Sequence, residues 1–497
     1  MEPCFLCGKP GQSECPDCRL VAVCSKEHKT LHRPEKLCFP FKIEQDPVKG
    51  RLMVANRDIQ PLELILYDRT MAFGPKMGSA PVCLHCMKPI QNVDHLCSTC
   101  AWPFCSDKCS QSQTHRMECS ILARNKMKLD FSDFENPHDH YRCIAPLRFL
   151  LLRESEPNFY QRFQYLMDHN KERRLDLDTW QTYQTYVNKF LRENCQLKDT
   201  FSNEEIDRAC GLFWTNAFSC NSGGGQAIFP TFSFMSHSCT SNANHVVFPN
   251  RHLALQAKVL IKKGDEITIS YISPLQSTMR RQAKLRDKWF FECSCSRCQD
   301  PSENGTNLSS LKCKASVLNE DQPCQGILTS NLASKGSECA WTCSKCSNQV
   351  PAKIVLELEN SIAKELKEAE SHKDIAVIEE ILQKFETVLH PNHFLLILLK
   401  RHIIALGCDK ISELELEQLE KIQTFCEEVL NVINRIDPGY NRDRGLILGH
   451  LANVKKFRCR KMFHKELIPQ PVFQRQVEEC MILFGESQKC MSMLVKK

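Results

Sequence analysis

The sequence predicts an α+β chain of several domains, and three observations support this class. Cysteines recur at short, regular spacings through roughly the first quarter of the chain. The middle of the chain alternates short β-branched and apolar runs with turn residues, whereas the residues beyond Ala352 repeat with helical periodicity. At 497 residues the chain has room for about three domains.

The composition restricts the class of protein further. The apolar content of 42% allows sizeable cores, and the formal charge of +6 is too mild for a dedicated DNA-binding protein. No apolar run reaches the length of about 18 residues that a membrane span needs, and the first residues do not resemble a secretion signal. The 31 cysteines therefore indicate metal ligands rather than disulfides. We expect a protein of the nucleus and/or cytoplasm that binds no membrane.

The first segment, residues 1–40, reads as a zinc finger. It holds eight thiol and imidazole donors, enough for two tetrahedral zinc sites. A unit this short buries too little apolar surface to fold alone, so metal binding must supply its folding free energy. The donors are Cys4, Cys7, Cys15, Cys18, Cys24, His28, His32 and Cys38.

A second finger is predicted at residues 83–119, again with eight donors in four closely spaced pairs. Such spacing is among the most specific signals in the chain. The donors are Cys83, Cys86, Cys97, Cys100, Cys105, Cys109, His115 and Cys119.

The segments around the second finger differ in their predicted structure. Residues 45–80 alternate as two short strands around a turn at Gln60–Pro61. Residues 120–218 read as helices, with a capping box at Ser202–Glu205. Two further segments follow at 219–275 and 276–300, and the second contains the run Cys293-Ser-Cys-Ser-Arg-Cys298.

The last part of the chain contains a linker, a further cysteine cluster and a helical domain. Pro301–Ser310 reads as a polar linker. Within residues 310–348, the spacing of Cys313, Cys324, Cys343 and Cys346 is typical of a zinc ribbon, with Cys339 as a competing ligand and buried free thiols as the alternative. Residues 350–497 carry apolar helical stripes, one of them Leu419, Ile422, Cys426, Val429 and Ile433.

Three stretches resemble the core of a SET domain: Phe229–Ala243, Gly264–Ile272 and Cys293–Cys298. With the two fingers, the chain resembles the SET-and-MYND family, most closely its arthropod-type branch, with an extra N-terminal finger. The resemblance implies a β-rich SET domain interrupted by a MYND finger and a helical insert, then a post-SET zinc site and a TPR-like helical domain. It also implies an S-adenosylmethionine-dependent protein-lysine N-methyltransferase that acts on a histone or non-histone protein, with a role in transcriptional regulation.

The same resemblance assigns the metal ligands. In the MYND pattern the donor pairs interleave, so alternate pairs share one zinc ion, and His28 stands where the family has cysteine. The fourth ligand of the post-SET site comes from a distant motif. The implied sites are Cys4, Cys7, Cys24 and His28; Cys15, Cys18, His32 and Cys38; Cys83, Cys86, Cys105 and Cys109; Cys97, Cys100, His115 and Cys119; and Cys239, Cys293, Cys295 and Cys298. With the ribbon, about five or six structural zinc ions are expected.

Candidate active-site residues also follow from the resemblance. Tyr271 matches the catalytic tyrosine of the family, and Trp289 stands where a tyrosine usually lines the lysine channel. The implied cofactor contacts are Gly50, Arg51, Ser236, His237 and Phe291.

Three residues depart from the family pattern. Leu52 replaces a glycine, Ser236 replaces an asparagine, and Trp289 replaces a tyrosine. They favour an alternative function, a catalytically weak or inactive scaffold whose fingers bind proline-rich protein partners. Direct nucleic-acid binding ranks below both, because the modest charge gives little electrostatic attraction. We expect a monomer.

Overall fold

The computed structural model describes residues 10–15, 22–26, 29, 39–220, 224–248, 250–315, 324–330, 340–372 and 374–492. In the first finger, β1 (Ser13–Glu14) pairs antiparallel with β2 (Ala22–Val23). Two of its predicted ligands, Cys15 and Cys24, are described. The other six lie outside the described residues: Cys4, Cys7, Cys18, His28, His32 and Cys38.

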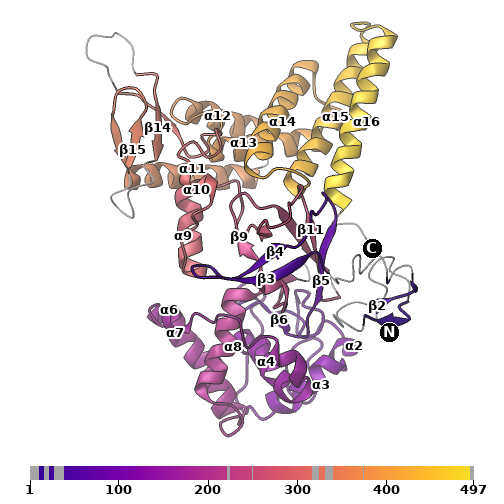
Figure 1. Ribbon diagram of the computed structural model, residues 1–497, viewed down its shortest axis with the longest axis vertical. Coiled ribbons are helices and arrows are strands. Elements are labelled where there is room, and N and C mark those ends of the chain that lie inside the picture. The colour runs from indigo at the N-terminus through magenta and orange to yellow at the C-terminus, as the bar shows by residue number, and fades with distance from the viewer. Residues whose placement is uncertain are drawn as a thin grey trace.

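Short strands at the centre of the molecule form four small sheets (Figure 1). Their orders are β10-β11-β5, β6-β8-β7, β3-β4 and β9-β12. As expected, a turn near Pro61 separates β4 from β5, but these two strands pair with different partners. The strands are β3 (Phe41–Asp46), β4 (Gly50–Ala55), β5 (Leu64–Arg69), β6 (Phe73–Pro75), β7 (Phe218–Cys220), β8 (Gly225–Ala227), β9 (Ser236–His237), β10 (Ala243–Val247), β11 (His252–Ala257) and β12 (Thr268–Ile269).

The helical insert covers one end of these sheets (Figure 1). The predicted capping box is present, because Ser202 and Glu205 bond reciprocally at the start of α8. Apolar residues of the second finger, such as Leu84 and Trp102, are buried in the same core as the insert and the strands. The finger is therefore part of this core. The helices are α2 (Asp107–Ser110), α3 (Gln113–Leu122), η2 (Asp139–Cys143), α4 (Ile144–Ser155), α5 (Pro157–Gln161), α6 (Asn170–Arg173), α7 (Leu177–Tyr183), the π-helix η3 (Gln184–Asn194), α8 (Asn203–Asn216) and the 3₁₀ helix η5 (Phe232–Phe234).

The segment expected to be a polar linker is instead largely buried, so that prediction was wrong. It follows α9 (Thr278–Trp289) and α10 (Ser296–Gln299). Glu303 and Thr306 are each 1% exposed. The Asp300 carboxylate accepts the amides of Ser302 and Asn304 and so shapes the turn. The local composition of this segment is polar, as in an exposed linker. Its polar side chains nevertheless form hydrogen bonds with buried partners.

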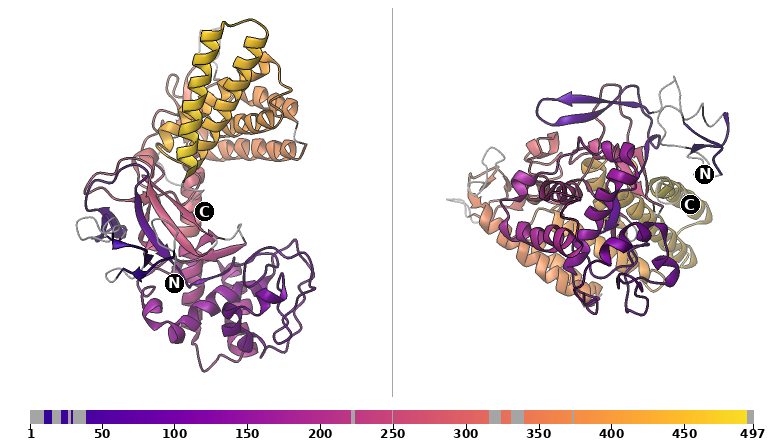
Figure 2. Two further views of the ribbon diagram at one scale, coloured as in Figure 1. Left: turned by 90° about the vertical axis from the view of Figure 1, so that its right-hand side faces the viewer. Right: turned by 90° about the horizontal axis from the view of Figure 1, so that it is seen from below.

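The C-terminal part begins with a four-stranded sheet and ends in six helices, which lie at the opposite end of the molecule from the insert (Figures 1 and 2). The predicted stripe from Leu419 to Ile433 is buried on α14. The elements are β13 (Leu311–Lys312), β14 (Ile327–Ser330), β15 (Ala340–Cys343), β16 (Gln349–Pro351), α11 (Ala352–His372), α12 (Ile375–Glu386), α13 (Phe394–Asp409), α14 (Leu416–Ile436), α15 (Arg442–His464) and α16 (Gln470–Met491).

The loop between α14 and α15 attaches these helices to the central strands. The buried ammonium of Lys258 donates to Ser241 Oγ at 2.9 Å and also to Asp437. The Tyr440 amide donates to the Lys258 carbonyl, and Asn244 Nδ2 donates to the Tyr440 carbonyl, at 2.9 and 2.8 Å. Within the part of the chain that the structure describes, none of the helices combines the length and apolar character of a membrane span.

Candidate active site and metal centres

Tyr271 stands just after β12, at the centre of the candidate active site. Its amide donates to Nδ1 of His237 at 3.0 Å, and its hydroxyl donates to the carbonyl oxygen of Met235. Burial raises the pKa of Tyr271, and the charge of Glu266 raises it further. The phenol therefore stays protonated at neutral pH and can orient a reacting group without acting as a base.

The pairing of β9 with β12 explains how these residues meet. The two strands run parallel, with Ser236 opposite Thr268 and His237 opposite Ile269. The short parallel pair brings Tyr271 onto the motif that contains His237, although about thirty residues separate them in sequence.

Aromatic rings surround Tyr271. The ring centroid of Tyr271 lies 5.1 Å from that of Trp289, 5.2 Å from that of His237 and 6.5 Å from that of Phe291. The indole N–H of Trp289 donates to the Thr215 carbonyl at 2.9 Å, which ties the end of α9 to α8. The site is a half-buried cluster of aromatic rings with one fixed hydroxyl, a chemistry suited to an amine on a long apolar stem.

His237 connects this pocket to a cysteine cluster. Its Nδ1 accepts the Tyr271 amide, so the ring proton lies on Nε2, which faces Cys239 Sγ at 3.3 Å. One imidazole thus positions both the backbone of the catalytic candidate and a predicted zinc ligand.

The predicted cofactor segment lies at the start of β4. Gly50 has φ of +80°, which side-chain-bearing residues rarely adopt. The guanidinium of Arg51 lies 5.3 Å from the Tyr165 ring centroid and 4.7 Å from that of Phe234, and it donates to the Tyr165 carbonyl. Its other N–H groups have no partner among the described residues, so they fit a carboxylate such as that of an amino-acid cofactor.

Two of the departures from the family pattern lie in regular strands. Leu52 lies in β4 opposite Glu44 and is not among the residues with positive φ, so this position does not require glycine for conformational reasons. Ser236 is half-buried in β9. The half-buried ring of Phe291, 6.1 Å from His237, offers a planar face to a base. Together with Arg51, these residues fit a nucleoside cofactor that carries an amino-acid end.

The predicted post-SET ligands lie close together. The sulfur atoms of Cys239, Cys293, Cys295 and Cys298 all lie within 4.8 Å of one another. The neighbouring Cys239 side chain lowers the pKa of Cys295 to about 5. Arg281 Nε donates to Cys239 Sγ at 3.2 Å, and its Nη2 lies 3.7 Å from Cys298 Sγ.

The charges around this cluster favour thiolates and a divalent ion. Arg281 and Arg297 are fully buried, and both donate to Oε2 of Glu303, at 2.6 and 2.8 Å. Two guanidinium groups and one carboxylate leave one net positive charge in the interior. Four thiolates around a zinc ion carry two net negative charges and so compensate it. The donor set therefore fits structural zinc, whereas four neutral thiols would leave the charge buried. This network was not predicted from the sequence.

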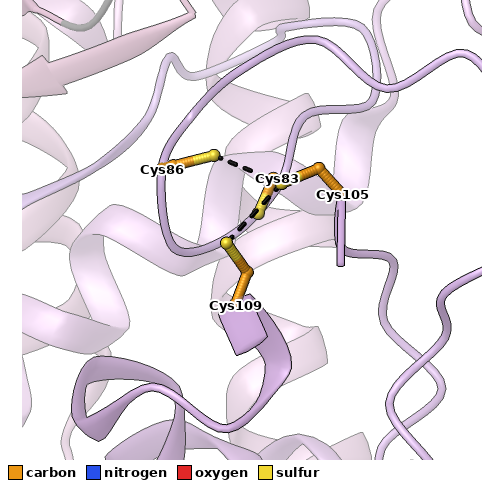
Figure 3. A group of neighbouring side chains, drawn as sticks. All are labelled: Cys83, Cys86, Cys105 and Cys109. Atoms are coloured by element: carbon orange, nitrogen blue, oxygen red, sulfur yellow. Dashed lines mark hydrogen bonds between the residues drawn. The ribbon is translucent and has the colours of Figure 1, made fainter. Parts of the chain in front are cut away.

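The second finger brings its eight predicted ligands together in two groups of four. In the first, the side chains of Cys83, Cys86, Cys105 and Cys109 point toward a common centre (Figure 3). In the second, Cys97, Cys100, His115 and Cys119 hold their ligand atoms within 4.8 Å of one another. Both groups follow the interleaved pattern and suit tetrahedral zinc.

A buried ion pair supports the ligand His115. Its Nδ1 lies 3.4 Å from Oε1 of Glu118, which leaves Nε2 facing Cys100 Sγ. Glu118 in turn accepts from Nε and Nη2 of Arg148 on α4, at 2.6 and 2.7 Å. A carboxylate behind a metal-bound histidine fixes its tautomer and orientation. Through Arg148, this support links the finger to the helical insert.

The ribbon cysteines also converge. Sulfur atoms of Cys313, Cys324, Cys343 and Cys346 lie within 4.8 Å of one another, and the competing Cys339 lies outside the described residues. The Gly326 amide donates to Cys324 Sγ, and the Lys345 amide donates to Cys343 Sγ, both at 3.3 Å. Backbone donors aimed at sulfur favour thiolates at this site.

Gly326→Ala is expected to remove zinc from the ribbon. A Cβ at position 326 would lie 2.3 Å from Cys343 Sγ and 3.3 Å from Cys324 Sγ, so the ligands must move apart. Zinc released to a chromophoric chelator after denaturation should fall by about one ion per chain. As a control, Gly485→Ala places its Cβ where no atom lies within 4 Å and should retain all zinc. Equal zinc content in the two variants would contradict a metal site here.

The chain matches a family model and several known proteins. The SET domain family model matches residues 50–272. "SET domain-containing protein SmydA-8, isoform A" of Drosophila melanogaster is 28% identical over 427 residues, which cover 83% of this chain and 88% of that protein. "Histone-lysine N-methyltransferase SMYD3" of Homo sapiens is 28% identical over 289 residues, 54% of this chain and 64% of that protein.

Two further comparisons are more distant. "Histone-lysine N-methyltransferase ASHR1" of Arabidopsis thaliana is 26% identical over 426 residues, 80% of this chain and 81% of that protein. The solved SET domain of LSMT bound to lysine and AdoHcy aligns with 92% of this chain and 86% of its own, at 12% identity and a TM-score of 0.31. A TM-score this low does not establish a common arrangement of the whole chain.

The matched segment contains Gly50, His237 and Tyr271, so the fold and site define a SET-domain protein. Together with its named relatives, this match indicates a SET-and-MYND family protein.

Proposed function

We propose that the protein is an S-adenosylmethionine-dependent protein-lysine N-methyltransferase. The observation that carries the proposal is the fixed hydroxyl of Tyr271 among half-buried aromatic rings, with Arg51 over the ring of Phe234, the residue before Met235. The relatives named as histone-lysine methyltransferases support the reaction class.

The residues of the pocket have distinct roles in this reaction. Because the Tyr271 hydroxyl donates its hydrogen to the Met235 carbonyl, its oxygen lone pairs remain free to accept an N–H of the substrate amine. Trp289 would exclude water and disfavour the charged ammonium, which must release its proton to solvent before it attacks. The amine nitrogen then forms a bond to carbon in line with the bond that breaks.

Five residues are proposed to hold the cofactor. Arg51 would hold its carboxylate, Phe291 would cover its base, and Gly50, Ser236 and His237 would line the remainder. When bound, S-adenosylmethionine supplies the electrophilic methyl group on a sulfonium centre.

Zinc is proposed as structural at every cysteine cluster. Each described group offers four protein ligands, and a closed tetrahedral site has no position for a reactive water. The post-SET ion would connect Cys239, next to His237, with the segment that follows Trp289 and Phe291. Metal in this place holds the walls of the pocket together.

Titration calorimetry of S-adenosylmethionine into the zinc-loaded protein tests the proposal directly. We expect stoichiometric binding in the micromolar range, about −8 kcal/mol. A folded, zinc-replete protein that binds none would overturn the assignment and favour the second candidate function, a scaffold that binds protein partners through its fingers. The observation that favours this second candidate is Trp289, whose bulky indole lies 5.1 Å from Tyr271 and narrows the pocket.

A further inference from the structure

Lys288 lies at the outer edge of the candidate active site. It precedes Trp289 at the end of α9, and its Nζ lies 4.4 Å from the centroid of the indole ring. The side chain as a whole is exposed, so a bound substrate can reach it. The ammonium is held in place by attraction to the face of the indole.

A second cation, Lys76, acts on Lys288 through its charge. It follows β6, and its amide donates to the Gly224 carbonyl at 3.1 Å. Partial burial of the ammonium lowers the pKa of Lys288, and the positive charge of Lys76 lowers it further. The contact of Lys288 with the indole is the geometric observation, and the charge of Lys76 adds to it.

Neither cation has a carboxylate to compensate it. The ion pairs among the described residues include neither Lys76 nor Lys288, although a neighbour on the same helix, Arg286, pairs with Glu292 at 2.9 Å. Because Lys288 is exposed and forms no ion pair among the described residues, its ammonium is available to a carboxylate of another molecule.

We infer that the substrate carries aspartate or glutamate next to its target lysine, and that Lys288 and Lys76 select for these acidic residues. The inference rests on the proposed function, since it takes Trp289 as a wall of the lysine-binding pocket. An acidic segment would pair with both ammonium groups, whereas a lysine- and arginine-rich segment would be repelled by them. The preferred substrate class is therefore an acidic protein segment, and strongly basic tails are disfavoured.

Peptide binding measured by fluorescence anisotropy tests the selection. Labelled peptides would carry one central lysine flanked by aspartate, alanine or arginine, and the protein would be the zinc-loaded full chain. We expect the aspartate peptide to bind about fivefold more tightly than the alanine peptide for each pair that forms, and the difference should shrink as salt is added. Equal affinity for all three peptides would overturn the inference.

Charge reversal assigns the effect to these residues. Lys288→Glu and Lys76→Glu should each weaken binding of the aspartate peptide and strengthen binding of the arginine peptide. The matched control is Lys367→Glu, which changes an exposed residue of α11. It alters the net charge by the same amount at a position distant in sequence from Lys288 and Lys76. If Lys288→Glu and Lys367→Glu shift the affinities equally, the selection does not depend on the pocket.

Methyl transfer to the same peptides separates the two proposals. Charge-selective binding without any methyl transfer would refute the catalytic function while the binding preference stands. Methyl transfer at equal rates to all three peptides would support catalysis and refute the selection by Lys288 and Lys76.

Discussion

Tyr271→Phe is expected to lower the rate of methyl transfer by about 10²- to 10⁴-fold, the range typical for loss of a positioned polar group in a transition state. The phenylalanine ring still fits against Trp289 and His237, so the pocket keeps its shape. The variant lacks the hydroxyl that is proposed to orient the substrate amine. The rate is measured from transfer of labelled methyl groups at saturating cofactor, and calorimetry with S-adenosylmethionine checks that the affinity is retained.

The control for this prediction is Tyr160→Phe, which removes a phenol whose ring packs on Phe149, in the helical insert. It should leave the rate unchanged. Tyr271→Phe also leaves the Met235 carbonyl without its donor, at a cost of about 1–3 kcal/mol in the free energy of unfolding. Thermal denaturation therefore has to show a folded variant at the assay temperature. A folded Tyr271→Phe protein with the wild-type rate would exclude this residue from catalysis.

The predicted metal ligands were the part of the site most accessible from the sequence. Ligand pairs such as Cys83 and Cys86 are adjacent in the chain, so their spacing alone reports the geometry of the site. The structure brings the same groups together, including the ribbon pair Cys343 and Cys346. The contact of Tyr271 with His237 is different, because it depends on the β9–β12 pairing between distant segments. The resemblance to a known family pointed to the two residues but not to their contact.

The buried charged residues could not be predicted from the sequence, and the reason is physical. Glu303 lies in a stretch of serine, asparagine and glycine that has the local composition of an exposed loop. Glu303 is buried because it pairs with Arg281 of α9 and Arg297 of α10. Likewise, nothing near Glu118 in the sequence indicates that Arg148 lies beside it. Pairing across tertiary structure leaves no periodic signal in the chain.

Glu303→Gln is expected to destabilise the protein by about 3–5 kcal/mol, because it leaves two buried guanidinium groups without their shared carboxylate. The side chains of Arg281 and Arg297 are 0% exposed and that of Glu303 is 2% exposed, so water cannot compensate the change. Since Arg281 also donates to Cys239, the zinc-binding segment should loosen as well. Urea denaturation measures the loss of stability, and a chromophoric chelator measures faster zinc release from the native protein.

The matched control is Glu292→Gln, which breaks the exposed pair between Glu292 and Arg286, 2.9 Å apart, on the same segment. A surface pair contributes about 0–1 kcal/mol, so this variant should denature almost as the wild type does. If Glu303→Gln proves equally mild, the zinc thiolates alone neutralise both arginines, and the carboxylate is not needed. If it is severe while zinc release is unchanged, Glu303 stabilises the fold of residues 301–310 without supporting the metal. Severe destabilisation with rapid zinc release is the outcome that follows from one buried network joining Glu303, Arg281 and the ligand Cys239.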